Sequence, residues 1–160
     1  MPRFQEILLL VGRLNYTWTN TESLLIYLIA GLAKADKETA IIIFLTLNTT
    51  RARIELVERL AKKSTTSAAC RKDVLEITQK LSQQAKLRNK YSHCIYSFDE
   101  TGTQASTQLM RIFDSKESIK YGKMEALDDL EVTRINLSIE AIKEINRLIW
   151  AAVEEYSFPH

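Results

Sequence analysis

The feature that most constrains the fold is the position of proline, because Pro2 and Pro159 are the only prolines in the 160-residue chain. Proline breaks helices more strongly than any other residue, so the whole interior is free to form long helices. A helical spacing of three and four runs through Phe4, Ile7, Val11, Leu14, Trp18, Thr21, Leu25, Leu28 and Leu32. This spacing predicts one long helix with a single buried stripe, ending near Gly31 and Ala35-Asp36.

Three more helices are predicted before the middle of the chain gives way to a different pattern. The second covers about residues 37–47, and Asn48-Thr49-Thr50 is expected to cap a third over residues 51–63. The buried side of the third helix consists of Ile54, Val57, Leu60 and Ala61. Polar residues 64–67 form a connection to a fourth helix, from about Ala68 to Tyr91 or beyond, with Val74, Ile77, Leu81 and Leu87 facing inwards.

The helical pattern weakens after this point and returns only near the C-terminus. Residues 96–102 are rich in turn formers, and residues 108–126 favour two short strands around Asp114-Ser115. Asp128 followed by Glu131 is a capping box that opens the last helix, whose inward side is Val132, Ile135, Ile139, Ile142, Ile145 and Ile149. We therefore expect a single all-α domain over residues 1–160, an up-and-down bundle of four to five helices with a small β-hairpin or irregular insertion before the last helix.

The composition is that of a soluble globular protein, with 46% hydrophobic and 26% charged residues. A net charge of +2 means that any contact with nucleic acid must come from a local basic patch. The apolar runs at residues 24–33 and 40–47 fall short of the roughly 18 residues that span a bilayer. The N-terminus does not have the pattern of a signal peptide. These features predict a cytoplasmic protein without a membrane segment.

No sequence motif for a metal or a cofactor is present. Cys70 and Cys94 form no C-x-x-C pair, which favours two free thiols in a reducing cytosol over a zinc site. The chain also lacks a phosphate-binding glycine loop and the H-E-x-x-H, EF-hand and G-x-S-x-G motifs. We expect neither a metal nor a cofactor.

The strongest functional signal is the heptapeptide LRNKYSH, residues 87–93, at the end of the fourth predicted helix. If the helix continues, Asn89 and His93 lie four residues apart on one face, with Arg88 about a hundred degrees away. Histidine suits proton transfer near neutral pH, and the planar guanidinium of arginine fits a phosphate. These two groups are sufficient for RNA cleavage without metal, in which the ribose 2′-OH attacks the neighbouring phosphorus.

The segment Arg88-Asn89-Lys90-Tyr91-Ser92-His93 resembles the R-x-x-x-x-H motif of the HEPN superfamily (higher eukaryotes and prokaryotes nucleotide-binding), including the polar residue after the arginine. The resemblance implies a small helical bundle and, in many members, a metal-independent endoribonuclease of a toxin–antitoxin, phage-defence or RNA-processing system. It makes Arg88 and His93 the catalytic pair and Asn89 the supporting polar group. It also implies a homodimer with the two motifs at the interface, RNA as the substrate and an antitoxin protein as a possible partner.

One departure from the family pattern concerns Tyr96. In the branch paired with nucleotidyltransferase antitoxins, a tyrosine two residues after the histidine is the site of AMP attachment. In this chain the tyrosine stands three residues after His93. This spacing puts membership of that branch in doubt, although Tyr96 remains a candidate for lining the substrate site.

Several residues around the motif carry competing interpretations. His93 could instead be a helix-end histidine that interacts with a carbonyl group or the helix dipole. Lys86 and Lys90 are candidates for guiding a phosphate backbone, and Arg88 could pair with Glu22 or an acid of the last helix. Glu22 lies in a polar stretch of the first predicted helix, which either faces solvent or meets the motif as part of the substrate site. Two rival functions stay open: an inactive HEPN-fold module that binds RNA, nucleotide or protein, and a purely structural helical protein.

Overall fold

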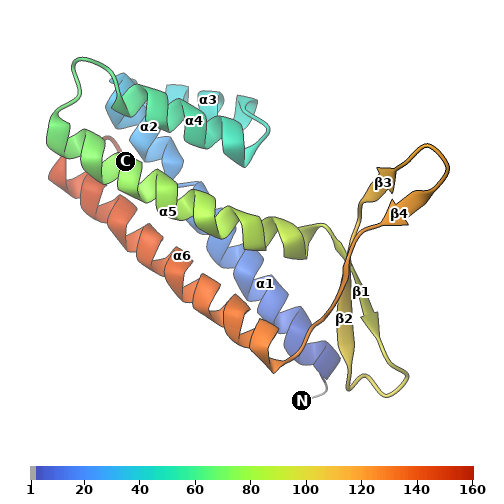
Figure 1. Ribbon diagram of the computed structural model, residues 1–160. Helices are drawn as coiled ribbons and strands as arrows, with labels where there is room; N and C mark the ends of the chain where they lie inside the picture. Colours follow the sequence, from blue (N-terminus) through green and yellow to red (C-terminus); the bar gives the residue numbers. More distant parts are fainter. Residues whose placement is uncertain (1–2) are drawn as a thin grey trace. The chain divides into compact units, whose positions relative to one another are not determined.

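The computed structural model describes residues 3–160. Helices α1 (Arg3–Glu22), α2 (Leu25–Ala33), α3 (Lys37–Thr46), α4 (Thr50–Ala61) and α5 (Ala68–Ser92) precede an insertion of short strands, and α6 (Asp129–Glu155) follows it (Figure 1). The strands are β1 (Cys94–Phe98), β2 (Ala105–Leu109), β3 (Ile112–Asp114), β4 (Ile119–Tyr121) and β5 (Met124–Ala126). The predicted architecture is confirmed: the fold is mostly helical, with a small antiparallel β insertion before the long last helix.

The contacts within the chain divide it into two compact units. Of the described residues, the strand unit comprises 3–16 and Lys86–Ile139, and the helical unit comprises Thr17–Ala85 and Glu140–His160. Helices α1, α5 and α6 each contribute residues to both units. Within residues 3–160, no helix combines the length and the hydropathy that a bilayer crossing requires.

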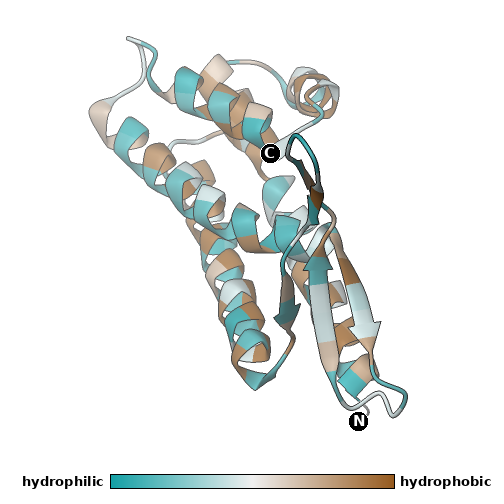
Figure 2. Cartoon of the chain, turned by 45° about the vertical axis from the view of Figure 1, so that its right-hand side comes forward, coloured by the Kyte–Doolittle hydropathy of each residue, from teal (hydrophilic) through white to brown (hydrophobic). Residues whose placement is uncertain are grey.

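The helical unit is built around α2, which packs against both α3 and α4. Leu25, Leu28 and Ile29 of α2 are fully buried, and along the helices hydrophobic and hydrophilic residues alternate as expected for half-buried elements (Figure 2). Gly31 allows the C-terminal segment to close over α2, because a Cβ at this position would lie 2.1 Å from the ring of Phe158. The glycine is therefore required by close packing.

The prediction of one helix from Phe4 to Leu32 is wrong at its centre, because the chain turns at Ser23 and Leu24 between α1 and α2. The Ser23 hydroxyl donates to the main-chain carbonyl of Asn20 (2.9 Å), and the Leu24 N–H bonds to Thr21, three residues back. A serine side chain that competes for helix carbonyls in this way loosens the helix locally. The apolar spacing of three and four residues continues across the turn, which explains why the sequence pattern predicts one helix.

Local capping interactions define several of the other helix ends. The Asp36 carboxylate accepts the Thr39 N–H at 2.7 Å, which begins α3 and lowers the pKa of Asp36. The Thr49 hydroxyl accepts the Ala52 N–H at 3.1 Å and begins α4, as the sequence predicts. At the end of α2, Lys34 adopts the left-handed conformation (φ 54°) and closes the helix.

The insertion contains two separate antiparallel sheets. One has the strand order β1-β2-β5, and the other is the isolated hairpin β3-β4 that includes the predicted turn after Asp114. The expectation of a turn over residues 96–102 is wrong for Tyr96, Ser97 and Phe98, which belong to β1. The turn begins at Asp99, whose carboxylate accepts the N–H of Gln104 (2.9 Å), the hydroxyl of Thr101 (2.8 Å) and the N–H of Thr103 (2.7 Å). These bonds lower the pKa of Asp99 to about 2.

Candidate active site

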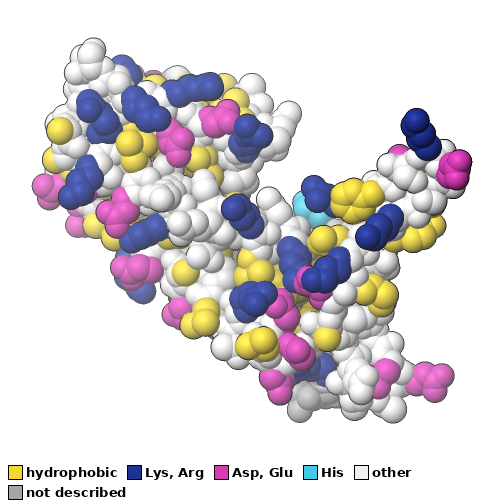
Figure 3. All heavy atoms as spheres, viewed as in Figure 1, with side chains coloured by type: hydrophobic (Ala, Val, Ile, Leu, Met, Phe, Trp, Pro, Cys, Tyr) yellow, Lys and Arg dark blue, Asp and Glu magenta, His cyan; other side chains and the backbone are white. Residues whose placement is uncertain are grey.

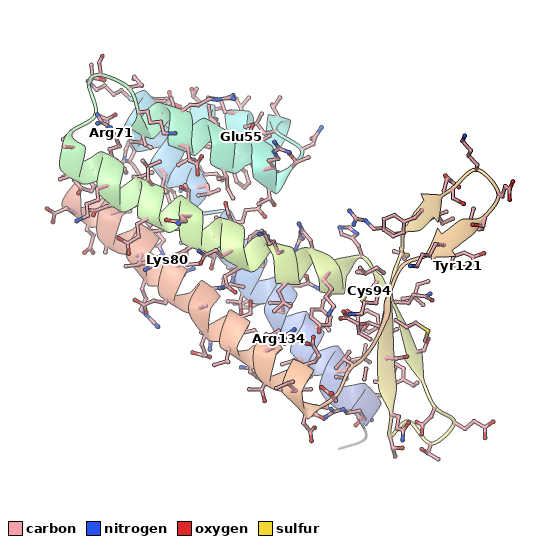
Figure 4. All side chains as sticks on the ribbon, in the orientation of Figure 1. Glu55, Arg71, Lys80, Cys94, Tyr121 and Arg134 are labelled. Carbon is pink, nitrogen blue, oxygen red and sulfur yellow. The ribbon has the colours of Figure 1, made fainter. Side chains whose placement is uncertain are left out.

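The motif lies where α5 gives way to the insertion in the strand unit. Arg88 and Asn89 belong to the last turns of α5, and His93 follows the last helical residue, Ser92. The His93 N–H bonds to the Lys90 carbonyl (3.3 Å), three residues back, and the His93 carbonyl accepts the N–H of Met110 (3.4 Å). Helix α5 and the residue that follows β2 therefore hold the backbone of His93. Figure 4 labels Cys94, the next residue, at this junction.

The side chains of the predicted catalytic residues are available to solvent to different degrees. His93 and Asn89 are exposed, and Arg88 is half-buried. The Arg88 guanidinium donates to the Asn89 side-chain oxygen at 3.2 Å, so the two residues are in direct contact. The hydrogen bonds that hold His93 involve its backbone. Because α5 ends at Ser92, the expectation that Asn89 and His93 share a regular helix face is wrong.

Lys90, predicted to guide phosphate, is instead engaged in ion pairs within the strand unit. Its ammonium group contacts the Glu125 carboxylate of β5 and lies 3.4 Å from Glu131 of α6. Burial lowers the pKa of Lys90, but the hydrogen bond that its ammonium group donates to Glu125 and the charges of both acids outweigh burial, so the pKa rises overall. Lys90 therefore joins α5, β5 and α6. Lys86, by contrast, is exposed.

Glu131 is the centre of a buried polar cluster that the sequence did not reveal as such. Its carboxylate accepts the hydroxyl of the buried Tyr91 and a bond from Arg134 (2.6 Å), while its N–H is capped by Asp128 (3.0 Å). Burial and the neighbouring carboxylate raise the pKa of Tyr91 strongly, so that the hydroxyl stays protonated and donates. The capping box of Asp128 and Glu131 correctly predicted the start of α6. It did not predict that the Glu131 carboxylate accepts a hydrogen bond from Tyr91.

The hydroxyl of Tyr96 points back to the motif. It donates to the main-chain carbonyl of Tyr91 at 2.5 Å, which ties β1 to the last turn of α5. Burial, together with the adjacent Cys94 thiol, raises the pKa of Tyr96. Cys94 and Cys70 are both free and buried. The observed role of Tyr96 is to hold the backbone that precedes His93.

Glu22 belongs to the helical unit and is 7% exposed, so the alternative in which it faces solvent is wrong. Its carboxylate accepts bonds from Trp18 Nε1 (2.8 Å), the Thr50 hydroxyl (2.8 Å) and Arg53 (3.0 Å). Trp18 is fully buried, as its place in the apolar stripe predicts. Glu22 therefore has a structural role in its own unit.

Within residues 3–160, no three histidine, cysteine, aspartate or glutamate side chains converge as metal ligands would. No family model, no curated protein and no solved structure matches the chain.

The Lys90–Glu125 pair predicts an acid-sensitive contribution to stability. The hydrogen bond and the charge of Lys90 lower the pKa of Glu125 below its ordinary value of 4.5. A lowered folded-state pKa gives stability that is present above the unfolded-state pKa and is lost as pH falls through the folded one. We expect Glu125→Gln to remove about 0.5 kcal/mol at neutral pH, a small value because the carboxylate is 35% exposed and solvent screens it.

Urea unfolding at about pH 7 and about pH 3 measures this contribution. Wild type should lose more stability between the two pH values than Glu125→Gln does. Glu117→Gln, which changes an exposed carboxylate on the β3-β4 hairpin, is the matched control and should behave as wild type. Equal losses in wild type and Glu125→Gln would show that the pair contributes nothing.

Proposed function

We propose that the chain is a HEPN-like, metal-independent endoribonuclease that acts as a homodimer. The observation that carries the proposal is an exposed histidine whose backbone is held by α5 and by Met110, the residue that follows β2. In the last turns of α5, a few residues earlier, the Asn89 side-chain oxygen accepts a hydrogen bond from the guanidinium of Arg88. A positioned proton carrier and a positioned phosphate ligand are what RNA cleavage by the 2′-OH requires.

The proposed reaction breaks one phosphodiester bond and forms a cyclic one. A neutral imidazole of His93 accepts the proton of the 2′-OH as the oxygen attacks phosphorus. Arg88 stabilises the negative charge that develops on the phosphorane oxygens. The 5′-oxygen of the next nucleotide leaves with a proton, which the second imidazole of the dimer supplies as an imidazolium. The products are a 2′,3′-cyclic phosphate and a 5′-hydroxyl.

The neighbouring residues divide into substrate ligands and supporting residues. Lys86 is exposed near the motif and is proposed to contact the phosphate backbone. Lys90, Tyr91 and Tyr96 are proposed to position the motif, because their polar groups bond within the protein. A cytoplasmic toxin or phage-defence effector, restrained by an antitoxin protein, is the setting that the HEPN resemblance suggests.

Digestion of single-stranded RNA in excess EDTA tests the proposal directly. We expect cleavage to persist in EDTA and to leave 2′,3′-cyclic phosphate and 5′-hydroxyl ends, while an all-deoxy oligonucleotide of the same sequence stays intact. Loss of cleavage in EDTA, or products with 3′-hydroxyl ends, would contradict the mechanism. Binding of RNA without cleavage would favour the alternative function, an inactive HEPN-fold binding module.

A further inference from the structure

The β3-β4 hairpin is the most exposed element of the strand unit. All six residues of its two strands are exposed, so both faces of this two-stranded sheet are open to solvent. Two short strands alone are marginally stable in water, and large apolar side chains are exposed on them, including Ile112, Phe113, Ile119 and Tyr121. These properties are typical of a surface that binds a partner.

The strand register gives the two faces different chemistry. Phe113 pairs with Lys120, so these side chains share one face, and the Arg111 guanidinium lies 6.0 Å from the centre of the Phe113 ring. We call Arg111, Phe113 and Lys120 the basic–aromatic face. Ile112 pairs with Tyr121, and Asp114 pairs with Ile119; these four residues make up the opposite face.

The charge of this segment favours a polyanion. Residues 110–124 carry four basic side chains, Arg111, Lys116, Lys120 and Lys123, against the two acids Asp114 and Glu117. Their net charge of +2 equals that of the whole chain, so the other 145 residues are neutral together. Hydrophobic and basic side chains lie side by side on the hairpin in Figure 3. Because Lys123 lies 3.4 Å from Glu125, Arg111 and Lys120 are the better phosphate ligands.

The hairpin also begins at the candidate active site. Met110, the residue that leads into Arg111, donates its N–H to the His93 carbonyl. At about 3.3 Å per residue along an extended strand, Phe113 lies about 10 Å beyond this point. A nucleic-acid strand with a phosphate at His93 can therefore place a neighbouring base on the hairpin.

We propose that the basic–aromatic face binds single-stranded RNA next to the cleavage point. Phe113 stacks on an unpaired base, and Arg111 and Lys120 contact the flanking phosphates. Stacking on an aromatic ring accepts every base, so the hairpin selects unpaired RNA with little sequence preference. This inference rests on the proposed ribonuclease function and names its substrate as a single strand.

Binding of a 2′-O-methyl oligonucleotide, which lacks the attacking hydroxyl, tests the hairpin without cleavage. Fluorescence anisotropy should show about tenfold weaker binding for Phe113→Ala and near wild-type binding for Phe113→Tyr, which keeps a stacking ring. Lys120→Gln should weaken binding and reduce its dependence on salt. A duplex of the same sequence should bind more weakly than the single strand.

Ile112→Ala is the matched control, because Ile112 neighbours Phe113 on the same strand, is similarly exposed (60% against 52%) and lies on the other face. It should leave RNA affinity unchanged. Unchanged affinity in Phe113→Ala, or no binding by wild type, would overturn the inference. So would loss of RNA affinity in Ile112→Ala together with dissociation of a dimer in sedimentation, because the hairpin would then be a protein interface.

Cleavage assays keep this test separate from that of the proposed function. Metal-independent cleavage by wild type, with unchanged RNA affinity in the hairpin variants, would overturn only the hairpin inference. Cleavage that persists in His93→Ala would overturn the proposed catalytic site, while a tenfold loss of affinity in Phe113→Ala would still support RNA binding by the hairpin.

Discussion

Replacement of His93 by alanine is expected to slow RNA cleavage by about 10²–10⁴-fold, the usual contribution of a general acid–base group. If both imidazoles of a dimer act, the variant loses both proton-transfer steps at once. The side chain is exposed, so the fold and the RNA affinity should be retained. Single-turnover rates in EDTA, measured with saturating protein, isolate the chemical step from binding.

His160→Ala is the matched control because the chain has only two histidines. His160 belongs to the helical unit, where its ring packs edge-on against Tyr27 and Trp150 at 6.5 and 6.1 Å between ring centres. We expect wild-type cleavage from this variant. Equal activity of wild type and His93→Ala would exclude His93 from the reaction, and free imidazole should partly restore His93→Ala if the lost group carries a proton.

Variants of the arginine separate charge from geometry at the same site. Arg88→Lys keeps the positive charge but loses the planar group of donors that fits two phosphate oxygens. We therefore expect the rate to stay well below wild type in Arg88→Lys. Asn89→Ala removes the hydrogen bond to the guanidinium (3.2 Å) and should have a smaller effect, because it alters only the position of Arg88. These effects would show that the motif stabilises charge through Arg88 in addition to transferring protons through His93.

The parts of the fold that depend on local signals could be predicted from the sequence. The end of α5 was expected near Tyr91 and is observed at Ser92, and Thr49 and Asp128 cap the helices that they were expected to cap. Strand β1 was missed because its partner, β2, lies beyond the Asp99 turn and its pairing is not visible in a local pattern.

The role of each charged residue was harder to predict than its position. Lys90 was placed correctly at the motif, but its partner Glu125 lies 35 residues later, in a strand that the sequence did not predict accurately. Glu22 similarly pairs with Arg53, which lies 31 residues later in the chain. Whether a charged side chain is available to a ligand depends on such distant partners. The sequence therefore identified candidate ligand-binding residues, and the structure distinguished those that are exposed from those that form ion pairs within the protein.

Replacement of Arg53 by methionine is expected to lower the free energy of unfolding by about 3–5 kcal/mol, the typical cost of breaking a buried ion pair. The Arg53 and Glu22 side chains are 18% and 9% exposed and lie 3.0 Å apart. Arg53 Nε also donates to the carbonyls of Phe44 (3.1 Å) and Leu47 (2.9 Å) at the end of α3. The variant leaves a buried carboxylate without its cation and two helix-end carbonyls without their donor.

Arg51→Met is the matched control, two residues earlier on α4. Arg51 forms an ion pair of the same length with Glu55 (3.0 Å), but its side chain is 88% exposed. Exposed pairs contribute little, so we expect a change within about 0.5 kcal/mol. Urea unfolding of the two variants compares a buried with an exposed arginine–glutamate pair, since the substitution is the same in both. A similar loss of unfolding free energy in both variants would show that burial of the Arg53–Glu22 pair adds nothing to stability.

Glu22→Gln then distinguishes a structural role of Glu22 from the substrate-binding role that the sequence suggested. Together with Arg53→Met it completes a double-mutant cycle, and the double variant should be destabilised by less than the sum of the single changes. At a temperature where Glu22→Gln remains folded, we expect wild-type RNA affinity and cleavage rate. Weaker RNA binding by the folded variant would show that Glu22 contributes to the substrate site. Loss of stability alone would show that Glu22 acts only in the packing of the helical unit.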